Sequence, residues 1–201
     1  MLTLYGDRDS GNSYKVELVL TQLGKPHRYV VIDTLKGETR TAEFLAKNPN
    51  GRVPVLEIDD GTYLPESNAI LCYLAEGSAL MPTDRLERAQ VLQWLFFEQY
   101  NHEPNIATAR HWLRAGLLTP EREYAFAQKR LAGYAALGVM EDHLERHRFF
   151  VGERYSIADI CLYAYTHVAG QGDFDLARFP AVEAWLDRVR SQPGHVAMLK
   201  D

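Results

Sequence analysis

Short apolar runs alternate with helical patterns along the first 80 residues of the chain. Val16, Val19, Leu20 and Leu23 form a helical stripe that Gly24 ends. Runs rich in β-branched residues predict strands, and an Asp-Gly turn predicts a hairpin. The predicted strands cover residues 2–5, 27–32, 53–58 and 62–64, and the predicted helices cover residues 13–23, 41–47 and 67–74. The order βαβαββα predicts a mixed α/β domain over residues 1–79.

The remainder of the chain shows almost no strand pattern. Helical spacing extends over residues 84–114, with an interruption near Glu103-Pro104. Three later helix starts follow: Thr119-Pro120-Glu121 with Thr119 as the cap, Ser156-Ile157-Ala158-Asp159 with the spacing of a capping box, and Phe179-Pro180. We expect the helix that begins at Thr119-Pro120-Glu121 to end at about residue 146. Together these helical stretches predict an all-helical domain over residues 84–201.

Composition narrows the class of protein. The 201 residues are 46% hydrophobic and 24% charged, which is typical of a globular chain. Acidic residues outnumber basic ones by 27 to 22, and neither half has the basic excess of a nucleic-acid-binding protein. No apolar run is long enough to span a membrane, and the N-terminus lacks the pattern of a signal peptide.

The two cysteines also limit the chemistry. Cys72 and Cys161 are too few and too far apart for a disulfide framework or a thiolate zinc site. The histidines show no metal-ligand spacing, so we expect no metal. A reducing cytoplasm is the expected compartment.

The first candidate site is Ser10-Gly11-Asn12-Ser13, at the start of the first predicted helix. Helix N-termini carry unpaired N–H groups and a partial positive charge, so they stabilise anions. A redox protein of this topology would place Cys-x-x-Cys here, whereas this chain has Ser-x-x-Ser. The loop can therefore donate hydrogen bonds to a thiolate but cannot supply one. Alternatively, Asn12 or Ser13 only caps the helix.

Two further motifs offer binding groups. Val53-Pro54 follows a Gly51 turn and is compatible with a cis peptide bond, which would leave the backbone of Val53 available to an extended peptide. Glu66-Ser67 opens the helix after the hairpin, and offers a carboxylate to an ammonium group and a hydroxyl to a carboxylate. A cap with a first-turn acid is the alternative interpretation of this second motif.

In combination, these motifs resemble the soluble glutathione transferases. Four segments carry the resemblance: Ser10 with Val16 six positions on, Asn48-Pro49-Asn50-Gly51-Arg52-Val53-Pro54-Val55-Leu56, Glu66-Ser67-Asn68-Ala69-Ile70 and Ser156-Ile157-Ala158-Asp159. They span most of the chain in the family's order. The resemblance implies an N-terminal thioredoxin-like domain followed by an all-helical domain.

The resemblance also implies residue roles. Ser10 matches the serine that hydrogen-bonds the glutathione sulfur in the theta, zeta and phi-like branches, with Asn12 as a possible partner and Tyr5 as an alternative. Val53 and Pro54 match the residues for the cysteinyl part, and Glu66 and Ser67 match the pair for the γ-glutamyl group. The positional candidates for the glycine carboxylate are Arg40, Arg52 and Lys36. The acceptor pocket is expected along the interrupted helical stretch, with Tyr100, Arg110 and Trp112 as candidates. The last three residues are equally compatible with core or dimer contacts.

The activity implied is that of a glutathione transferase, active as a homodimer on a small electrophile, with glutathione as co-substrate and no metal. A second possibility is glutathione-dependent reduction of a disulfide or peroxide, towards which bacterial relatives with an asparagine near the sulfur tend. A third is a non-catalytic relative that uses the fold for binding or assembly. Retention of Ser10, Val53-Pro54 and Glu66-Ser67 argues against the third.

Overall fold

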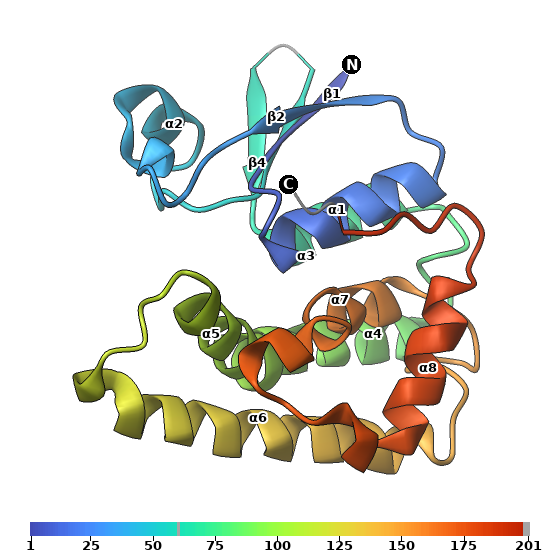
Figure 1. The fold of residues 1–201 in the computed structure, drawn as a ribbon. Coiled ribbons are helices and arrows are strands. Elements are labelled where there is room, and N and C mark those ends of the chain that lie inside the picture. The colour runs from blue at the N-terminus through green and yellow to red at the C-terminus, as the bar shows by residue number, and fades with distance from the viewer. Residues whose placement is uncertain (60, 199–201) are drawn as a thin grey trace. The chain divides into compact units, whose positions relative to one another are not determined.

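A computed structural model describes residues 1–59 and 61–198 and divides the chain into two compact units (Figure 1). The first unit contains Met1–Met81 together with the C-terminal segment that begins at Pro193, and the second contains Pro82–Gln192. The return of the C-terminal segment to the first unit differs from the sequence-based boundary, which placed all residues from 84 onward with the helices. None of the described helices is both long and apolar enough to cross a membrane.

The first unit is built on a four-stranded sheet. Its strands are β1 (Leu2–Gly6), β2 (His27–Val31), β3 (Val55–Ile58) and β4 (Thr62–Pro65), in the spatial order β2-β1-β3-β4. β1 pairs parallel with β2 and antiparallel with β3, so the sheet is mixed as predicted. The third strand begins at Val55 rather than at the predicted residue 53, directly after Pro54, which has no N–H to donate to a ladder.

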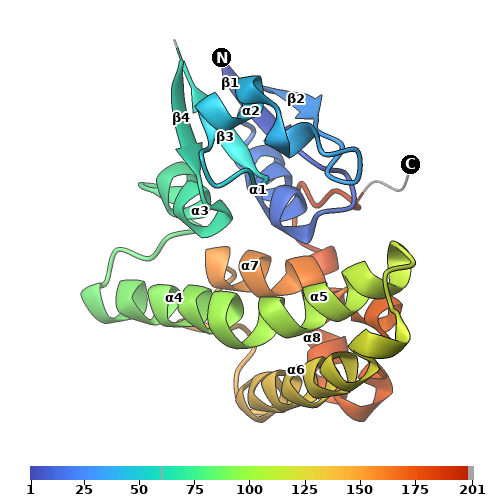
Figure 2. The same ribbon diagram turned by 90° about the vertical axis from the view of Figure 1, so that its left-hand side faces the viewer.

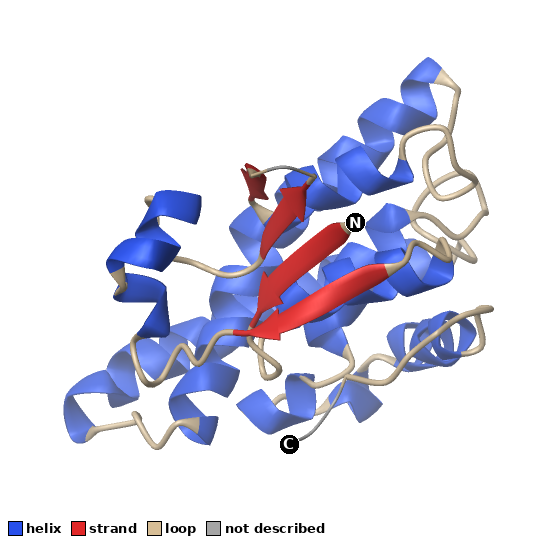
Figure 3. Ribbon diagram, turned by 90° about the horizontal axis from the view of Figure 1, so that it is seen from above, coloured by secondary structure: helices blue, strands red, loops and turns tan. Residues whose placement is uncertain are grey.

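Three helices cover this sheet. They are α1 (Gly11–Gln22), α2 (Ala42–Lys47) and α3 (Ser67–Ala75). Helices α1 and α3 lie side by side under the sheet (Figures 1 and 2). Phe44 of α2 instead packs with Tyr5 and Val55, whereas the neighbouring Leu4 is fully buried. Because successive side chains of a strand point to opposite faces, α2 packs against the face opposite to that of Leu4. In Figure 3 this helix lies beside one end of the sheet.

The second unit contains only helices in its regular structure. They are α4 (Arg85–Phe97), a π-helical segment (Glu98–His102), α5 (Glu103–Arg114), α6 (Glu123–Leu144), α7 (Ile157–Thr166) and α8 (Pro180–Arg190). The predicted interruption is real, but it is the π-helical turn just before Pro104, a proline that lies in the first turn of α5. Every residue of α7 is buried, which makes it the central helix of this unit.

For the second unit the sequence predicts two helix caps, Ser156 and Thr119, and the structure confirms only the first. The capping box of α7 is confirmed: Ser156 Oγ accepts from the amide of Ala158 at 3.2 Å, and the amide of Ser156 donates to Asp159 Oδ2 at 3.0 Å. The prediction that Thr119 caps the next helix is wrong, because its side chain accepts no capping hydrogen bond. Its hydroxyl bonds the carboxylate of Glu121 instead, which lowers the pKa of that glutamate, and Pro120–Arg122 form a short 3-10 turn before α6.

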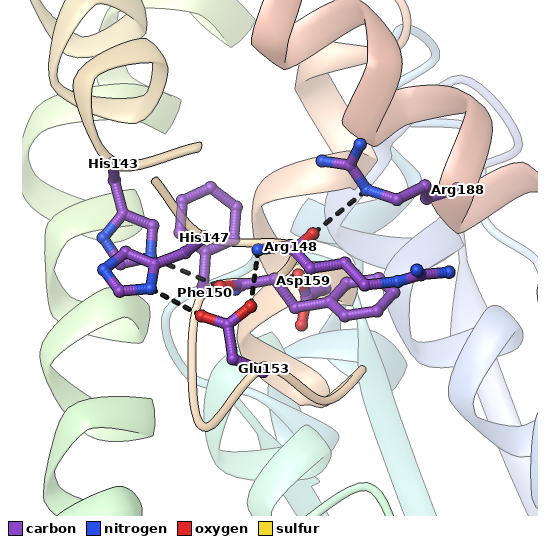
Figure 4. A network of polar contacts seen from close by, with 8 residues as sticks. His143, His147, Arg148, Phe150, Glu153, Asp159 and Arg188 are labelled. Atoms are coloured by element: carbon purple, nitrogen blue, oxygen red, sulfur yellow. Dashed lines mark hydrogen bonds and ion pairs between the residues drawn. The ribbon is translucent and has the colours of Figure 1, made fainter. Parts of the chain in front are cut away.

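A loop between α6 and α7 brings a further donor to Asp159 (Figure 4). Glu153 accepts from the amide of Arg148 at 2.8 Å and contacts His147 Nδ1 at 2.5 Å, so the loop is closed on itself. The amide of Phe150 then donates to Asp159 Oδ1 at 3.3 Å. The first turn of α7 is therefore fixed both by its own capping box and by the hydrogen bond from this loop to Asp159.

Candidate functional site

Ser10 caps α1, which rules out the alternative that Asn12 or Ser13 does so. Its backbone is extended, with φ −86° and ψ 116°, and its Oγ accepts from the amide of Ser13 at 3.2 Å. The bond occupies a lone pair of the hydroxyl and leaves its proton for another acceptor. The first turn of α1 contains no acidic residue, so within the helix itself no carboxylate faces its positive end.

Asn12 joins this turn to the start of α3. Ser67 Oγ donates to Asn12 Oδ1 at 3.2 Å, and Ser67 is only 5% exposed. One turn further on, the fully buried Lys15 donates from Nζ to Asn68 Oδ1 at 3.0 Å. The structure therefore brings together two motifs that lie more than 50 positions apart in the sequence.

The peptide bond between Val53 and Pro54 is cis, which confirms the conformation that the resemblance implied. The turn before it is held by Asn48, which is 3% exposed. Asn48 Nδ2 donates to the carbonyl of Arg52 at 2.8 Å, and Asn48 Oδ1 accepts from the amide of Asn50 at 3.0 Å. These contacts explain why an asparagine precedes the turn: its amide supplies both a donor and an acceptor.

Glu66 has an unusual backbone for a residue with a side chain. Its φ is 69° and its ψ is 106°, and it directly precedes the first residue of α3. Conformations of this kind cost on the order of 1–3 kcal/mol and persist where the surrounding structure imposes them, often at functional sites. The side chain of Glu66 is exposed and makes no capping bond, so its carboxylate is not used to satisfy the helix.

The three candidate cations for a carboxylate differ in their surroundings. Arg40 is exposed and donates from Nη1 to the carbonyl of Asn50 at 3.3 Å, which places it beside the turn that leads to the cis bond. Arg52, also exposed, belongs to that same turn. Lys36 forms an ion pair with Asp33 at 3.0 Å, and the bond and charge of Asp33 raise the pKa of this lysine. Arg40 and Arg52 are thus the two that the structure groups around one turn.

Tyr5 has a different environment from Ser10. Its hydroxyl donates to Glu57 Oε2 at 2.8 Å, and it packs in the cluster under α2. Burial, the hydrogen bond from the hydroxyl to Glu57 and the charge of that carboxylate raise the pKa of Tyr5 to about 12. A phenol already bound to a carboxylate and held neutral is a poor donor for an arriving thiolate.

The three residues expected to line an acceptor pocket do not form a group. Tyr100 lies in the π-helical segment and is 85% exposed. Arg110 is 4% exposed and donates from Nε to Gln171 Oε1 at 2.8 Å, so it has a structural partner. Trp112 is half-buried, with the guanidinium of Arg122 5.5 Å from its ring centre. Arg110 and Trp112 are two positions apart on α5 and therefore point about 200° apart around the helix.

Sequence reasoning missed how the loop before Ser10 is anchored. The carboxylate of Asp7 accepts from the amide and hydroxyl of Thr34 and from the amide of Asp9, and the carbonyl of Asp7 accepts from the amide of Ser10 at 3.1 Å. A polar residue in a polar loop gives no signal of such a role, because Thr34 is 27 positions away. Among residues 1–59 and 61–198 no group of three or more histidine, cysteine or acidic side chains could hold a metal ion.

Comparisons with known proteins agree on one family. The family model for the N-terminal domain of glutathione S-transferase matches residues 9–76, and that for its C-terminal domain matches residues 94–193. A glutathione S-transferase structure from Pseudomonas fluorescens [Pf-5] is 54% identical, with a TM-score of 0.97 over 99% of both chains. The Disulfide-bond oxidoreductase YfcG of Escherichia coli (strain K12) is 33% identical over 189 residues, which cover 90% of this chain and 87% of that one.

A third relative was solved with a ligand. The structure described as Ure2p in complex with glutathione is 27% identical, with a TM-score of 0.87 over 96% of this chain and 90% of that chain. Together with the mixed four-stranded sheet and the helical second unit, these matches identify the fold predicted from the motifs. The chain belongs to the glutathione S-transferase family.

Proposed function

We propose that this protein binds glutathione, stabilises its thiolate at the N-terminus of α1 and directs it onto a small, largely apolar electrophile. The observation that carries the proposal is the start of α1, where the Ser10 hydroxyl retains a proton to donate and the first turn holds no acid. The family membership makes glutathione the expected thiol, and this chain offers no cysteine at that position.

The energetic demand on this site is modest. A free thiol with a pKa of about 8.5 is only a few per cent ionised at pH 7. Lowering that pKa by about two units requires roughly 2.7 kcal/mol of preferential thiolate stabilisation. A hydrogen bond to a charged group supplies about 1.5–3 kcal/mol and a helix N-terminus about 0.3–2 kcal/mol, so Ser10 and the first turn of α1 together can reach this amount. No metal or general base is needed for this step.

The remaining motifs are proposed to hold the rest of the peptide. The backbone of Val53 pairs with the cysteinyl part beside the cis proline Pro54. Glu66 with the backbone amide of Ser67 binds the γ-glutamyl end, since the Ser67 hydroxyl already donates to Asn12 Oδ1. The glycine carboxylate is assigned to Arg40 and Arg52, because both flank the turn before the cis bond. Tyr100 and Trp112 remain proposed acceptor contacts, whereas the burial of Arg110 against Gln171 favours a structural role for it.

We also propose that the protein is a homodimer in which the first domain of one copy meets the second domain of the other. Exposed apolar side chains on both units support this: Tyr73 on α3 is 50% exposed, and Leu92 and Phe96 on α4 are 43% and 70% exposed. Sedimentation equilibrium measures the mass directly. Phe96→Glu should shift a dimer towards monomer, and a wild-type monomer would contradict the proposal.

Titration calorimetry with glutathione is the first test of the function. We expect saturable binding at millimolar ligand or below, and absence of binding would refute every glutathione-dependent activity. A thiolate absorbance titration of the complex should then show a pKa below that of free glutathione. Ser10→Ala should raise that pKa by about one to two units and reduce turnover with a chloronitrobenzene acceptor about 10- to 100-fold. Tyr5→Phe should change neither; the reverse pattern would assign the role to Tyr5.

Disulfide reduction is the second candidate, and two observations favour it. Asn12 lies in the first turn of α1 and is held by Ser67, and the YfcG relative is described as a disulfide-bond oxidoreductase. In this reaction the thiolate attacks one sulfur of a disulfide, a mixed disulfide forms and the other sulfur leaves as a thiolate. A second glutathione releases the product and forms glutathione disulfide. Turnover of a mixed disulfide without turnover of aromatic electrophiles would select this reaction.

A further inference from the structure

The C-terminal segment is attached to α1 by a buried tyrosine. The hydroxyl of Tyr14 donates to the carbonyl of Val196 at 2.7 Å and lies 3.3 Å from His195 Nε2. Since the only proton of the hydroxyl goes to Val196, we assign the proton of the second contact to His195 Nε2. Tyr14 is 2% exposed, so these bonds form away from water.

Tyr14 also completes the turn that contains Ser10. Its amide donates to the carbonyl of Ser10 at 2.9 Å, while the hydroxyl of Ser10 accepts from the amide of Ser13. The same residue is therefore bonded to Ser10 through its backbone and to the C-terminal segment through its side chain. Helix ends fray, and a side chain fixed within the first turn opposes this fraying.

The segment meets α1 at its other end as well. Gly194 has a φ of +70°, and a Cβ added to it would lie 3.2 Å from the Cα of Gln22, the last residue of α1. Within three residues the segment thus contacts the last residue of the helix and a side chain of its first turn. This arrangement constrains both the axial position of α1 and the conformation of its N-terminus.

We propose that Tyr14, held by residues 195–196 of the C-terminal segment, is a positioning residue that sets the orientation of the Ser10 hydroxyl towards the bound thiolate. The proposal rests on the proposed function of Ser10. Tyr14 touches neither the thiol nor the acceptor, and it acts through the first turn of α1. Loss of its hydroxyl therefore weakens thiolate stabilisation while leaving the contacts to the rest of glutathione in place.

Tyr14→Phe tests the proposal because it removes the hydroxyl and keeps the ring. We expect the pKa of the bound thiol to rise by about half a unit to one unit, and kcat/KM at pH 6.5 to fall about three- to tenfold. The KM for glutathione should stay within about twofold. Tyr63→Phe is the matched control, since Tyr63 lies on the other face of the sheet in the same unit.

Gly194→Ala provides a second test that leaves every residue of α1 unchanged. Alanine is strained at a φ of +70° and crowds Gln22, so the segment must shift. We expect a rise in the thiol pKa in the same direction as for Tyr14→Phe. Gly77→Ala introduces similar strain at a φ of +72°, where a Cβ would meet nothing within 4 Å, and should not move the thiol pKa.

The outcomes separate the two proposals. If wild-type protein binds glutathione and lowers its pKa while both Tyr14→Phe and Gly194→Ala leave that pKa unchanged, the positioning role is overturned and the proposed function stands. If Tyr14→Phe only reduces the unfolding temperature, at an unchanged thiol pKa, Tyr14 is structural and the positioning role is again overturned. If the wild-type protein binds no glutathione, the proposed function itself fails.

Discussion

Helices α1 and α7 both begin after a capping serine, but only α7 has a carboxylate in its first turn. Each starts after a serine whose hydroxyl accepts from a first-turn amide at 3.2 Å, Ser10 from Ser13 and Ser156 from Ala158. In α7 the turn also contains Asp159, whose carboxylate returns to the amide of Ser156. In α1 the first turn contains no acidic residue.

Burial sharpens this difference. Asp159 is completely buried and accepts from four groups: the amide and hydroxyl of Ser156, the amide of Phe150 and the indole N–H of Trp185. The chain therefore supplies a carboxylate at the positive end of α7, although burial raises the pKa of Asp159 to about 6 against the lowering effect of its hydrogen bonds. At α1 the first turn has no acidic residue, and in the proposed function the anion comes from glutathione. One capping chemistry serves folding in one unit and, by our proposal, binding in the other.

We call the start of α7 closed, because its first turn contains the carboxylate of Asp159, and the start of α1 open, because its first turn contains no acid. Asp159→Ala is the strongest test of the closed start. The substitution leaves buried donors of Ser156, Phe150 and Trp185 without an acceptor, and each such group costs about 1–3 kcal/mol. We expect the free energy of unfolding to fall by about 3–5 kcal/mol in urea titrations followed by circular dichroism. Asp187→Ala, on an exposed pair with Arg190, is the control and should cost less than about 0.5 kcal/mol. Equal effects would show that the box contributes nothing special.

Helix α8 is an intermediate case, because its anion comes from another helix. Glu141 of α6 accepts from the amides of Ala181 and Val182, both at 2.9 Å, and is 8% exposed. Glu141→Gln keeps one acceptor and loses the charge, so we expect a loss of about 1–2 kcal/mol in unfolding free energy. Glu145→Gln, at the exposed residue that directly follows α6, should be neutral. A neutral Glu141→Gln would mean that a first-turn charge is not what stabilises these helix starts.

Asn12→Asp converts the open start of α1 into one that resembles α7. The new carboxylate can still accept from Ser67 Oγ, so the local contact is retained. The charge should stabilise the helix by about 0.3–1 kcal/mol and raise the pKa of bound glutathione by about one unit through repulsion of the thiolate. The absorbance titration measures the second effect, and Gln128→Glu on α6 controls for added charge. An unchanged thiol pKa would show that the sulfur does not lie at this helix end.

Periodicity and capping patterns were sufficient to predict most of the architecture. The stripe through Val16 and Leu20 defines α1, and the spacing of Ser156 and Asp159 defines the start of α7. These signals are local, since a helix is bonded within itself. The sequence suggested Asn12 or Ser13 as the cap and not Ser10, and it could not discriminate among them because all three are competent capping types within four positions.

The features that the sequence did not predict depend on contacts between distant residues. Nothing local distinguishes Arg110, buried against Gln171, from an arginine exposed to a ligand. Likewise, the sequence does not reveal that residues 193–198 return to the first unit, or that Tyr5 meets Glu57 on the face of the sheet covered by α2. The candidate site was predictable as a set of motifs, whereas the partner of each side chain required the folded chain.

The closed start of α7 also depends on the loop that delivers Phe150, and His143 links that loop to α6 (Figure 4). His143 Nε2 contacts the carbonyl of Phe149 at 3.3 Å, and its ring stacks on Phe150 at 5.4 Å and on His147 at 4.5 Å. Burial lowers the pKa of His143, and the nearby charges of His147 and Arg146 add to this, against the opposing effects of the carbonyl of Phe149 and of Glu153.

A lowered histidine pKa means that the unfolded chain binds the proton more readily than the folded one. The stabilisation that the neutral His143 contributes is therefore complete above pH 6.5, the ordinary value for this side chain, and is lost as the pH drops below it. Asp159, whose pKa burial raises to about 6, titrates in the same range and contributes with the opposite sign, in the wild-type protein and in His143→Gln alike. We expect His143→Gln to reduce the loss of unfolding free energy between pH 7 and pH 5.5 by less than about 1 kcal/mol, the smallest effect considered. Urea titrations at both pH values measure it, with the exposed His111→Gln as control. If acid instead stabilised the wild-type protein more than His143→Gln, the loop would hold a charged imidazole and the closed start of α7 would not depend on a neutral one.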